Sequence, residues 1–326
     1  MFGDAGYSIT SDSSGNVYVT GQTGSDLDGQ TGVGVGDFFV MKYDSEGAKQ
    51  WTRLHGSDYS DTATGITSDS SGNVYVTGYT EGSIDNHTNA GQNDLFVVKY
   101  DSSGAKQWTK QLGTASNDIA SGIATDSSGN VYVTGNTDGA LDNNTSAGLD
   151  DLFVVKYDSG GAKQWIKQLG TSSEDRTHGI ATDSSGNVYV TGSTRGALDG
   201  SNVGGHDLFV VKYDSGGAKQ WTKQLGTSSW DFAYGIATDS SGNVYVTGST
   251  WGDLDGSNAG YADLFVVKYD SGGIKQWTQQ LGSAVDDTAF GITTDSSGSV
   301  YVTGSTWGVL NGINVGGGDL FVVKFK

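Results

Sequence analysis

Short apolar segments alternate with turn-forming residues along the whole chain. Between residues 65 and 112, four such segments occupy residues 65–68, 73–77, 95–100 and 106–112. In the second segment the valines alternate with Tyr75 and Thr77, which places the two kinds of residue on opposite faces of a strand. No segment has apolar residues at helical spacing. The pattern therefore predicts an all-β protein built from short strands.

The residues between these segments favour tight hairpins. The first and second segments are joined by Asp-Ser-Ser-Gly-Asn, and the third and fourth by Asp-Ser-Ser-Gly. Glycine readily adopts a positive φ, and an aspartate side chain can accept hydrogen bonds from nearby backbone amides. We therefore expect four antiparallel strands, connected in chain order.

This four-segment unit is repeated along the chain. The Ser-Ser step of the first turn recurs at spacings of 57, 57, 57, 56 and 56 residues, beginning at Ser13, Ser70, Ser127, Ser184, Ser240 and Ser296. The first three segments occur six times, and the fourth occurs five times because the sequence stops at Lys326. Four-stranded repeats are typical of propeller blades. We predict a single domain over residues 1–326, a six-bladed β-propeller of four-stranded antiparallel blades whose last blade lacks its outer strand.

Three motifs carry a resemblance to a known family. They are Gly-Asn-Val-Tyr-Val-Thr-Gly, Asp-Leu-Phe-Val-Val-Lys-Tyr-Asp-Ser-Gly-Gly-Ala-Lys-Gln-Trp and Gln-Leu-Gly-Thr, and together they cover most of the chain. The chain resembles the bacterial beta-propeller repeat (SBBP) family. The resemblance implies a propeller in a secreted or surface-exposed bacterial protein, generally without an assigned catalytic activity. An extracellular or cell-surface location is thus expected, although residues 1–4 do not resemble a signal peptide.

Composition narrows the classes of partner. The net charge of −19 argues against nucleic acid, because phosphate binding requires clustered Lys and Arg. No apolar run is long enough for a membrane helix, so we expect no membrane insertion. The absence of cysteine rules out disulfides and thiolate metal sites. We expect a monomer, with a dimer through the exposed edge of the last blade (residues 320–326) as the alternative.

The charge is unevenly distributed over the predicted topology. We define the top face as the loops that join the second to the third segment and the fourth to the next first segment. These loops contain 25 of the 37 acidic residues of the chain. Of the 18 Lys and Arg residues, they contain only two, Arg176 and Arg195. They also vary between repeats, unlike the turns at the other end. Variable loops on a rigid scaffold are typical binding surfaces, and an acidic one attracts cations.

Two sets of top-face carboxylates are candidate cation sites. One aspartate precedes the isoleucine of every first segment by five residues: Asp4, Asp61, Asp118, Asp175, Asp231 and Asp287. A second set brackets the loop between the second and third segments: Asp28/Asp37, Asp85/Asp94, Asp142/Asp151, Asp199/Asp207, Asp255/Asp263 and Asn311/Asp319. Either set could bind Ca²⁺, which prefers oxygen ligands, but neither has EF-hand spacing. The alternative is that each carboxylate accepts hydrogen bonds from its own loop.

Aromatic residues are the least symmetric feature of the repeats. One tryptophan recurs in each fourth segment, and we predict that it packs between blades: Trp51, Trp108, Trp165, Trp221 and Trp277. Three further tryptophans are not repeat residues, namely Trp230, Trp251 and Trp307, and four more aromatics fall in the same top loops of the last two blades: Phe232, Tyr234, Tyr261 and Phe290. They predict a patch that stacks on sugars or contacts a protein. The alternative is that these side chains only cover one another.

The sequence offers little evidence of catalysis. It has no Gly-x-Ser-x-Gly motif, and its four histidines (His55, His87, His178 and His206) share no metal-ligand spacing. We therefore predict a non-enzymatic binding or display module whose acidic top face binds cations and a glycan or protein. The alternatives are a structural spacer within a larger surface protein and a calcium-dependent propeller hydrolase.

Overall fold

The computed structural model describes residues 3–310, 312, 314 and 316–325. It confirms the predicted fold class: the chain is an all-β, six-bladed propeller with five four-stranded antiparallel sheets and a three-stranded last sheet. The chain divides into two compact units, Met1–Leu169 and Gly170–Lys326, each containing three blades. Among the described residues, no helix is long and apolar enough to cross a membrane.

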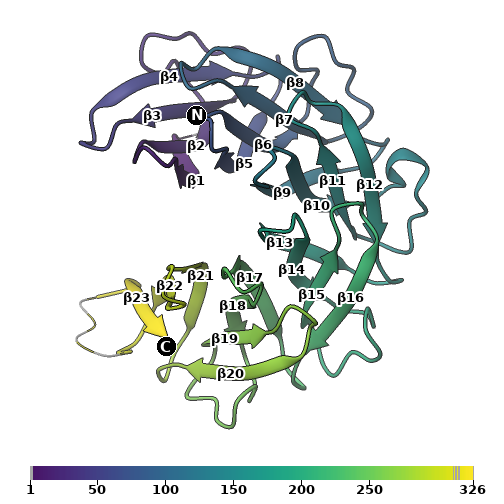
Figure 1. The fold of residues 1–326 in the computed structure, drawn as a ribbon, viewed down its shortest axis with the longest axis vertical. Helices are drawn as coiled ribbons and strands as arrows, with labels where there is room; N and C mark the ends of the chain where they lie inside the picture. The colour runs from purple at the N-terminus through teal and green to yellow at the C-terminus, as the bar shows by residue number, and fades with distance from the viewer. Residues whose placement is uncertain (1–2, 311, 313, 315, 326) are drawn as a thin grey trace. The chain divides into compact units, whose positions relative to one another are not determined.

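The first unit contains blades 1 to 3. Within each sheet the strands pair antiparallel in chain order. Figure 1 shows the first strands of these sheets side by side, away from the fourth strands. The strands are β1 (Ala5–Ser11), β2 (Val17–Thr23), β3 (Asp37–Tyr43), β4 (Lys49–His55), β5 (Asp61–Ser68), β6 (Val74–Thr80), β7 (Asp94–Tyr100), β8 (Lys106–Leu112), β9 (Asp118–Thr125), β10 (Val131–Thr137), β11 (Asp151–Tyr157) and β12 (Lys163–Leu169), with a 3₁₀ turn, η1, at Leu141–Asn143.

The second unit contains blades 4 to 6 and follows the same order. Its strands are β13 (Asp175–Thr182), β14 (Val188–Thr194), β15 (Asp207–Tyr213), β16 (Lys219–Leu225), β17 (Asp231–Thr238), β18 (Val244–Thr250), β19 (Asp263–Tyr269), β20 (Lys275–Leu281), β21 (Asp287–Thr294), β22 (Val300–Thr306) and β23 (Asp319–Phe325). The last sheet ends at β23, as the segment count predicted. Lys326, the last residue of the predicted exposed edge, lies outside the described residues.

The first strand of each blade is longer than its apolar pattern predicts. In blade 2 the prediction began at residue 65, whereas β5 begins at Asp61. The register between β5 and β6 shifts between Ala63 and Gly65, as in a β-bulge. A bulge interrupts the alternation of inward and outward side chains, so the sequence pattern conceals the first half of the strand.

A glycine in each second strand makes room for this bulge. A Cβ atom built at Gly192 would lie 1.8 Å from the carbonyl oxygen of Arg176 on the neighbouring strand. The equivalent glycines would be 1.8 to 2.0 Å from the matching carbonyl oxygen: Gly21, Gly78, Gly135, Gly248 and Gly304. No side chain fits at such a distance, so the close approach of the first two strands requires glycine.

The turn between the first and second strands is held by its aspartate. In blade 2, Asp69 accepts hydrogen bonds from the amides of Ser71 and Asn73, from Asn73 Nδ2 and from the Tyr75 hydroxyl, at 2.7 to 2.9 Å. Burial opposes ionisation of Asp69, but these hydrogen bonds hold its pKa below the usual value. The same geometry recurs in blades 1, 3, 4 and 5, and in blade 6 Ser299 replaces the asparagine while the amide and tyrosine bonds to Asp295 remain. These bonds explain why this turn varies so little.

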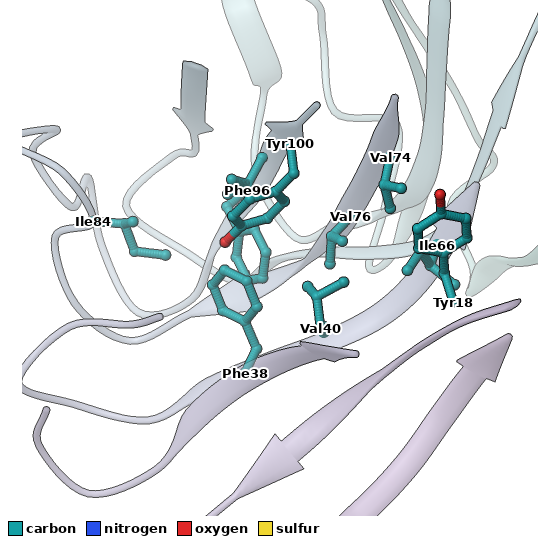
Figure 2. Packing of buried hydrophobic residues seen from close by; sticks show 11 residues of the cluster. Tyr18, Phe38, Val40, Ile66, Val74, Val76, Ile84, Phe96 and Tyr100 are labelled. Carbon is teal, nitrogen blue, oxygen red and sulfur yellow. The ribbon is translucent and has the colours of Figure 1, made fainter. Parts of the chain in front are cut away.

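Neighbouring blades pack through the faces of their sheets. Between blades 1 and 2, Val40 and Phe38 meet Val76 and Phe96, as Figure 2 shows. The rings of Phe38 and Phe96 stack with centroids 4.7 Å apart. All four side chains are fully buried. Because a blade is hydrophobic on both faces, it depends on its neighbours to remove that surface from water.

The tryptophan of the fourth strand joins one blade to the next, as predicted. Trp51 of blade 1 lies 6.0 Å from Tyr18 of its own blade and 6.5 Å from Tyr100 of blade 2, measured between ring centroids. Its indole nitrogen also donates to the carbonyl of Ser102 in the next blade's turn, at 3.4 Å. Trp108 and Trp221 make equivalent contacts in their own units.

The aspartate at the start of each first strand holds the loop before it. Asp231 is fully buried, and it accepts hydrogen bonds from the amide of Thr227 at 2.6 Å and from the hydroxyls of Thr227 and Thr250 at 3.0 and 2.5 Å. The amide four residues earlier is bound in the same way in four further blades, to Asp61, Asp118, Asp175 and Asp287. Each carboxylate therefore fixes the loop against its strand.

Replacing Gly192 by alanine is expected to lower the free energy of unfolding by at least about 2 kcal/mol, because the new methyl group would collide with the Arg176 carbonyl. Chemical denaturation measures this change. Gly312→Ala is the matched control, since nothing lies within 4 Å of its Cβ position. Equal stability of the two variants would contradict the close approach of the strands.

The contribution of Asp61 to stability is expected to increase as the pH falls from 7 to 5. Burial, with a smaller contribution from the nearby Asp37 carboxylate, raises the pKa of Asp61 from 3.8 to about 6. Folding then takes up a proton in this window, so protonation stabilises the folded state. Asp61→Asn should lose this contribution, so between pH 7 and pH 5 its melting temperature should change less favourably than that of the parent chain. Asp69→Asn should change in parallel with the parent chain, because the pKa of Asp69 is lowered and its contribution is lost only below about pH 4. An unchanged slope in Asp61→Asn would refute this assignment.

Candidate functional site

The six aspartates predicted as tentative metal ligands occupy the same position in every blade. Asp61, Asp118, Asp175, Asp231 and Asp287 begin first strands, and Asp4 immediately precedes β1. Asp4 also accepts a hydrogen bond from Thr23, at 2.5 Å. Because their oxygens accept hydrogen bonds from the protein, the geometry favours the loop-fixing interpretation over cation binding. No three His, Asp or Glu side chains are grouped to hold a metal ion in the part of the chain that the structure describes. Calcium binding stays a prediction.

The second acidic set divides into two kinds of residue. In unit 1 the first member of each pair forms an ion pair with a fourth-strand lysine of the same blade, at 2.5 or 2.6 Å: Asp28 with Lys49, Asp85 with Lys106 and Asp142 with Lys163. The second member begins a third strand, and Oδ2 of Asp94, for example, accepts from Ala90 and Gln111. These contacts again indicate a structural role. Asn311 lies outside the described residues.

Two kinds of backbone hydrogen bond bring variable residues of neighbouring top-face loops into contact. In blades 2 to 6, the residue after the second strand donates its amide to the carbonyl of the residue just before the fixed aspartate of the same blade: Trp251 to Trp230, for example, at 2.9 Å. The fixed aspartate donates its own amide to the residue before a third strand of the preceding blade, as Asp231 does to His206 at 2.8 Å. Variable side chains that are far apart in the sequence are thus brought together at each junction.

In blades 5 and 6 this arrangement assembles most of the predicted aromatic patch. We call Trp230, Phe232, Tyr234, Trp251 and Phe290 the aromatic row. Its members form a continuous series of ring contacts with centroids 5.6 to 6.5 Å apart. Trp230 and Phe290 remain more than half exposed. The row therefore combines mutual packing with an accessible aromatic surface.

Two predicted members of the patch are not joined to the row. Tyr261 and Trp307 are both mostly exposed, and neither makes a described ring contact with the row. Trp307 instead packs near the backbone of Gly318 in its own blade. The sequence identified all seven aromatics, but only the structure separates the five that are in contact.

A polar depression lies beside the row. It has a volume of about 600 Å³ and is lined by residues 226–229 together with Trp251, Gly252, Asp253, Asn258 and Gly260. Asn258 is held in place because its side-chain oxygen accepts from the Gly260 amide at 2.8 Å. An indole wall next to a carboxylate and an amide suits a ligand that has both apolar and hydroxyl-bearing faces.

The first unit contains an equivalent depression with a different lining. Its volume is about 710 Å³, and its lining includes Tyr59, Glu81, Ser83 and Asn89. Glu81 occupies the position of Trp251, and Asn89 that of Asn258. The backbone therefore forms a similar depression in both units, and the side chains at a few positions, such as Glu81 and Trp251, differ in charge and polarity.

Blade 4 contributes a cluster that sequence reasoning missed. Glu174 lies 3.6 Å from both Arg176 and Arg195, and Arg195 Nε donates to His206 Nε2 at 2.8 Å. His206 in turn lies 4.7 Å from Phe232 between ring centroids. Burial and the two arginines lower the pKa of His206, so the imidazole is neutral near pH 7. The sequence analysis noted only that the four histidines share no metal-ligand spacing, and it did not connect His206 with the arginines.

A signal for this cluster was present in the repeat spacing. Arg176 and Arg195 lie 56 residues before Phe232 and Trp251, so the arginines occupy the positions of the aromatic row. His178 is likewise the counterpart of Tyr234, and their rings are 5.2 Å apart. Burial and the neighbouring Arg176 lower the pKa of His178 to about 4. Comparing repeats position by position would have placed the basic and aromatic residues on one surface.

The same positions in blade 3 carry acidic residues. Asp138 and Asp150 correspond to Arg195 and His206, and a hydrogen bond between the two carboxyl groups, with burial, raises the pKa of Asp138 to about 6. The position after the second strand is thus acidic in blade 3 (Asp138), basic in blade 4 (Arg195) and aromatic in blade 5 (Trp251).

The chain is similar to segments of longer curated proteins. It is 27% identical over 268 residues to the regulatory protein FlaEY of Caulobacter vibrioides, covering 72% of this chain and 28% of that protein. It is also 27% identical over 228 residues to the uncharacterized WD repeat-containing protein L264 of Acanthamoeba polyphaga mimivirus, covering 54% of this chain and 16% of that protein. The chain therefore spans less than a third of the length of either relative.

Among solved structures, the fold is similar to the beta-propeller domain of the Trilobed protease from Pyrococcus furiosus, which has an open velcro topology. The TM-score is 0.51 at 9% identity, covering 99% of this chain and 82% of that domain. At this identity the likeness concerns the fold alone.

The repeats themselves match a known family. Residues 3–28, 50–85, 107–141, 164–198, 220–255 and 276–311 each match the SBBP beta-propeller repeat. These matches cover more than half of the chain, and each includes the first two strands of one blade. The chain therefore belongs to the SBBP family of beta-propeller repeat proteins.

Proposed function

We propose that this chain is a non-enzymatic binding and display module, and that a glycan binds on the second unit's aromatic row and the adjoining depression. The row carries the proposal. A sugar ring has apolar C–H faces that pack against aromatic rings, and hydroxyl groups that require hydrogen-bond partners. Trp251 provides an aromatic ring for the C–H face, and Asp253 and Asn258 provide hydrogen-bond partners for the hydroxyl groups. An extracellular or bacterial cell-surface location fits a glycan ligand.

Rigidity supports the proposal. The loop on one side of the depression is fixed by the Asp231 carboxylate, and the other is fixed by Asn258 and by the amide of Ala259, which donates to Asp263 at 2.8 Å. The binding surface is therefore formed before the ligand arrives, which lowers the entropy lost on binding. Weak ligands such as short oligosaccharides benefit most from this preorganisation.

Trp251→Ala is expected to weaken glycan binding by about thirtyfold, because a central aromatic contact contributes on the order of 2 kcal/mol. A glycan array would first identify a bound oligosaccharide, and titration calorimetry would then compare the variant with the parent chain. Tyr59→Ala is the matched control, since it removes an exposed aromatic residue from the first unit's depression.

The outcomes separate the alternatives. Equal binding by the parent chain and Trp251→Ala would remove the aromatic row from the proposal. The absence of any saturable glycan would favour a protein ligand or a structural spacer. Turnover of ester, lactone or glycoside substrates that stops on chelation would favour the hydrolase.

Removal of calcium is expected to leave the melting temperature unchanged, because hydrogen bonds from the protein already bind the fixed aspartates. Calorimetric melting after chelation, with and without millimolar calcium, measures this. A rise of several degrees with calcium would instead establish a cation site among the carboxylates, and the glycan experiments would then require calcium.

A further inference from the structure

We infer that the outer edge of the last blade binds an extended segment of a second polypeptide, one that carries the Trp-x-x-Gln-Leu pattern of the repeat's fourth strand. β23 (Asp319–Phe325) pairs on one side with β22, and in the part of the chain that the structure describes no strand pairs with its other side. Such an edge presents backbone donors and acceptors to which an extended segment can pair. The edge is distinct from the glycan site and does not depend on it.

The other blades show which kind of segment covers this edge. β23 has the sequence Asp-Leu-Phe-Val-Val-Lys-Phe, and β7, β11, β15 and β19 all read Asp-Leu-Phe-Val-Val-Lys-Tyr. Their fourth strands read Lys-Gln-Trp-Thr-Lys-Gln-Leu in blades 2 and 4, with Ile166 and Gln279 as the replacements in blades 3 and 5. In each pair the tryptophan lies opposite the third-strand lysine, and the two leucines lie opposite each other. Because the third strands are nearly identical, a segment of this pattern fits β23 in the same register.

The glutamine of the pattern binds the loop that precedes the third strand. In blade 5, Gln280 Nε2 donates to the Gly252 carbonyl at 3.0 Å and to Asp263 Oδ2 at 2.9 Å. Its Oε1 accepts from the Leu254 amide at 2.9 Å. The equivalent glutamines make the same three hydrogen bonds in blades 2, 3 and 4. The side chain therefore identifies a fourth strand more specifically than backbone pairing does.

Blade 6 contains a cavity at the place where this glutamine binds in the other blades. The cavity has a volume of about 460 Å³, and its lining includes Gly308, Leu310 and Asp319, the counterparts of the three residues that Gln280 binds in blade 5. Asn314 Nδ2 donates to the Gly308 carbonyl at 3.1 Å, and it also reaches the Gly317 carbonyl at 3.4 Å. A glutamine from an added strand can thus replace Asn314 at Gly308, while Asn314 keeps its second acceptor.

Apolar surface beside β23 matches the rest of the pattern. Leu264 of blade 5 is fully buried opposite Leu281, whereas its counterpart Leu320 is 83% exposed. A second cavity, of about 500 Å³, lies between the ends of β20 and β23 and is lined by Leu281 and Phe325. These two residues belong to the apolar cluster between blades 5 and 6, so the cavity continues an existing interface. An added strand would remove this surface from water.

The lysine of β23 does not prevent pairing. A lysine on an edge strand often discourages association with other chains. Lys324 Nζ, however, lies 4.9 Å from the centre of the Tyr301 ring and donates to its hydroxyl at 2.9 Å. Lys268 of blade 5 lies 5.1 Å from the Tyr245 ring in the same way, although β19 is paired with β20. The position of Lys324 is therefore compatible with an added strand.

Charge and composition favour a segment of another SBBP repeat over a second β23 edge. Lys-Gln-Trp-Thr-Lys-Gln-Leu carries two positive charges, and the chain has a net charge of −19, so attraction promotes their encounter. Five of the six family matches begin inside a fourth strand, at residues 50, 107, 164, 220 and 276, so such a strand is part of the repeat. Pairing of two β23 strands would supply neither the glutamine nor the tryptophan.

The test measures binding of a fluorescein-labelled peptide with the sequence of residues 218–226 to the full chain by fluorescence anisotropy. We expect saturable binding of one peptide per chain. Peptides with Trp221→Ala or Gln224→Ala should bind at least about tenfold more weakly, because each loses a central contact of the added strand. In the chain, Leu320→Lys should weaken binding about fivefold, since it removes a cross-strand pair and adds a positive charge beside a basic peptide. Ile274→Lys, at another exposed aliphatic residue of the same unit, is the control and should bind like the parent chain.

Three results would overturn the inference. One is the absence of saturable binding, and another is equal affinity for the parent and Gln224→Ala peptides. The third is a dimer in light scattering that Leu320→Lys dissociates, because the edge would then belong to a second copy of the chain. A melting temperature that rises with peptide concentration would support the inference, since the peptide binds only the folded blade. No glycan enters these experiments, so the proposed function is tested separately.

Discussion

The buried aspartate at the start of each first strand is the interaction on which the top face depends. Its carboxylate holds the amide four residues earlier, and its own amide bonds to the preceding blade, as Asp231 does to Thr227 and His206. The residue just before it is thereby placed against the residue that follows the second strand. One invariant residue thus fixes two variable ones. Burying a carboxylate is costly unless hydrogen bonds satisfy it, and the loop supplies those bonds.

The fold could be predicted almost completely from the sequence, because the same pattern of strands and turns recurs in six repeats. Tight turns depend on local residues such as Asp69, and a strand depends on a local alternation, so both are readable without tertiary information. The exception was the beginning of each first strand. The bulge beside Gly65 breaks the alternation there, and the carbonyl that approaches Gly78 comes from a different strand. A single segment contains no trace of that contact.

The candidate site was predictable only in part, for a related reason. Unusual residue types identified Trp230 and Trp251 as exceptions to the repeat, but nothing local indicated that their rings meet. Arg195 and His206 were overlooked because each residue type is ordinary in a loop. The significance of Arg195 lies in its position, since the repeat superimposes it on Trp251 of the next blade. A repeat protein encodes its surface through comparison between copies rather than through motifs within one copy.

This architecture separates stability from recognition. The packing between blades uses residues such as Phe38, Phe96 and Trp51, none of which lies at a variable top-face position. The variable positions are fixed by backbone hydrogen bonds, so their side chains contribute little to holding the loops. Asp138 of blade 3 and Arg195 of blade 4 occupy equivalent positions and make the same backbone hydrogen bond. The local charge therefore differs between the two blades while the backbone arrangement is the same. Because the backbone at these positions is already ordered, a new side chain acquires a defined direction at once, and the surface can change its ligand without rebuilding the loop that presents it.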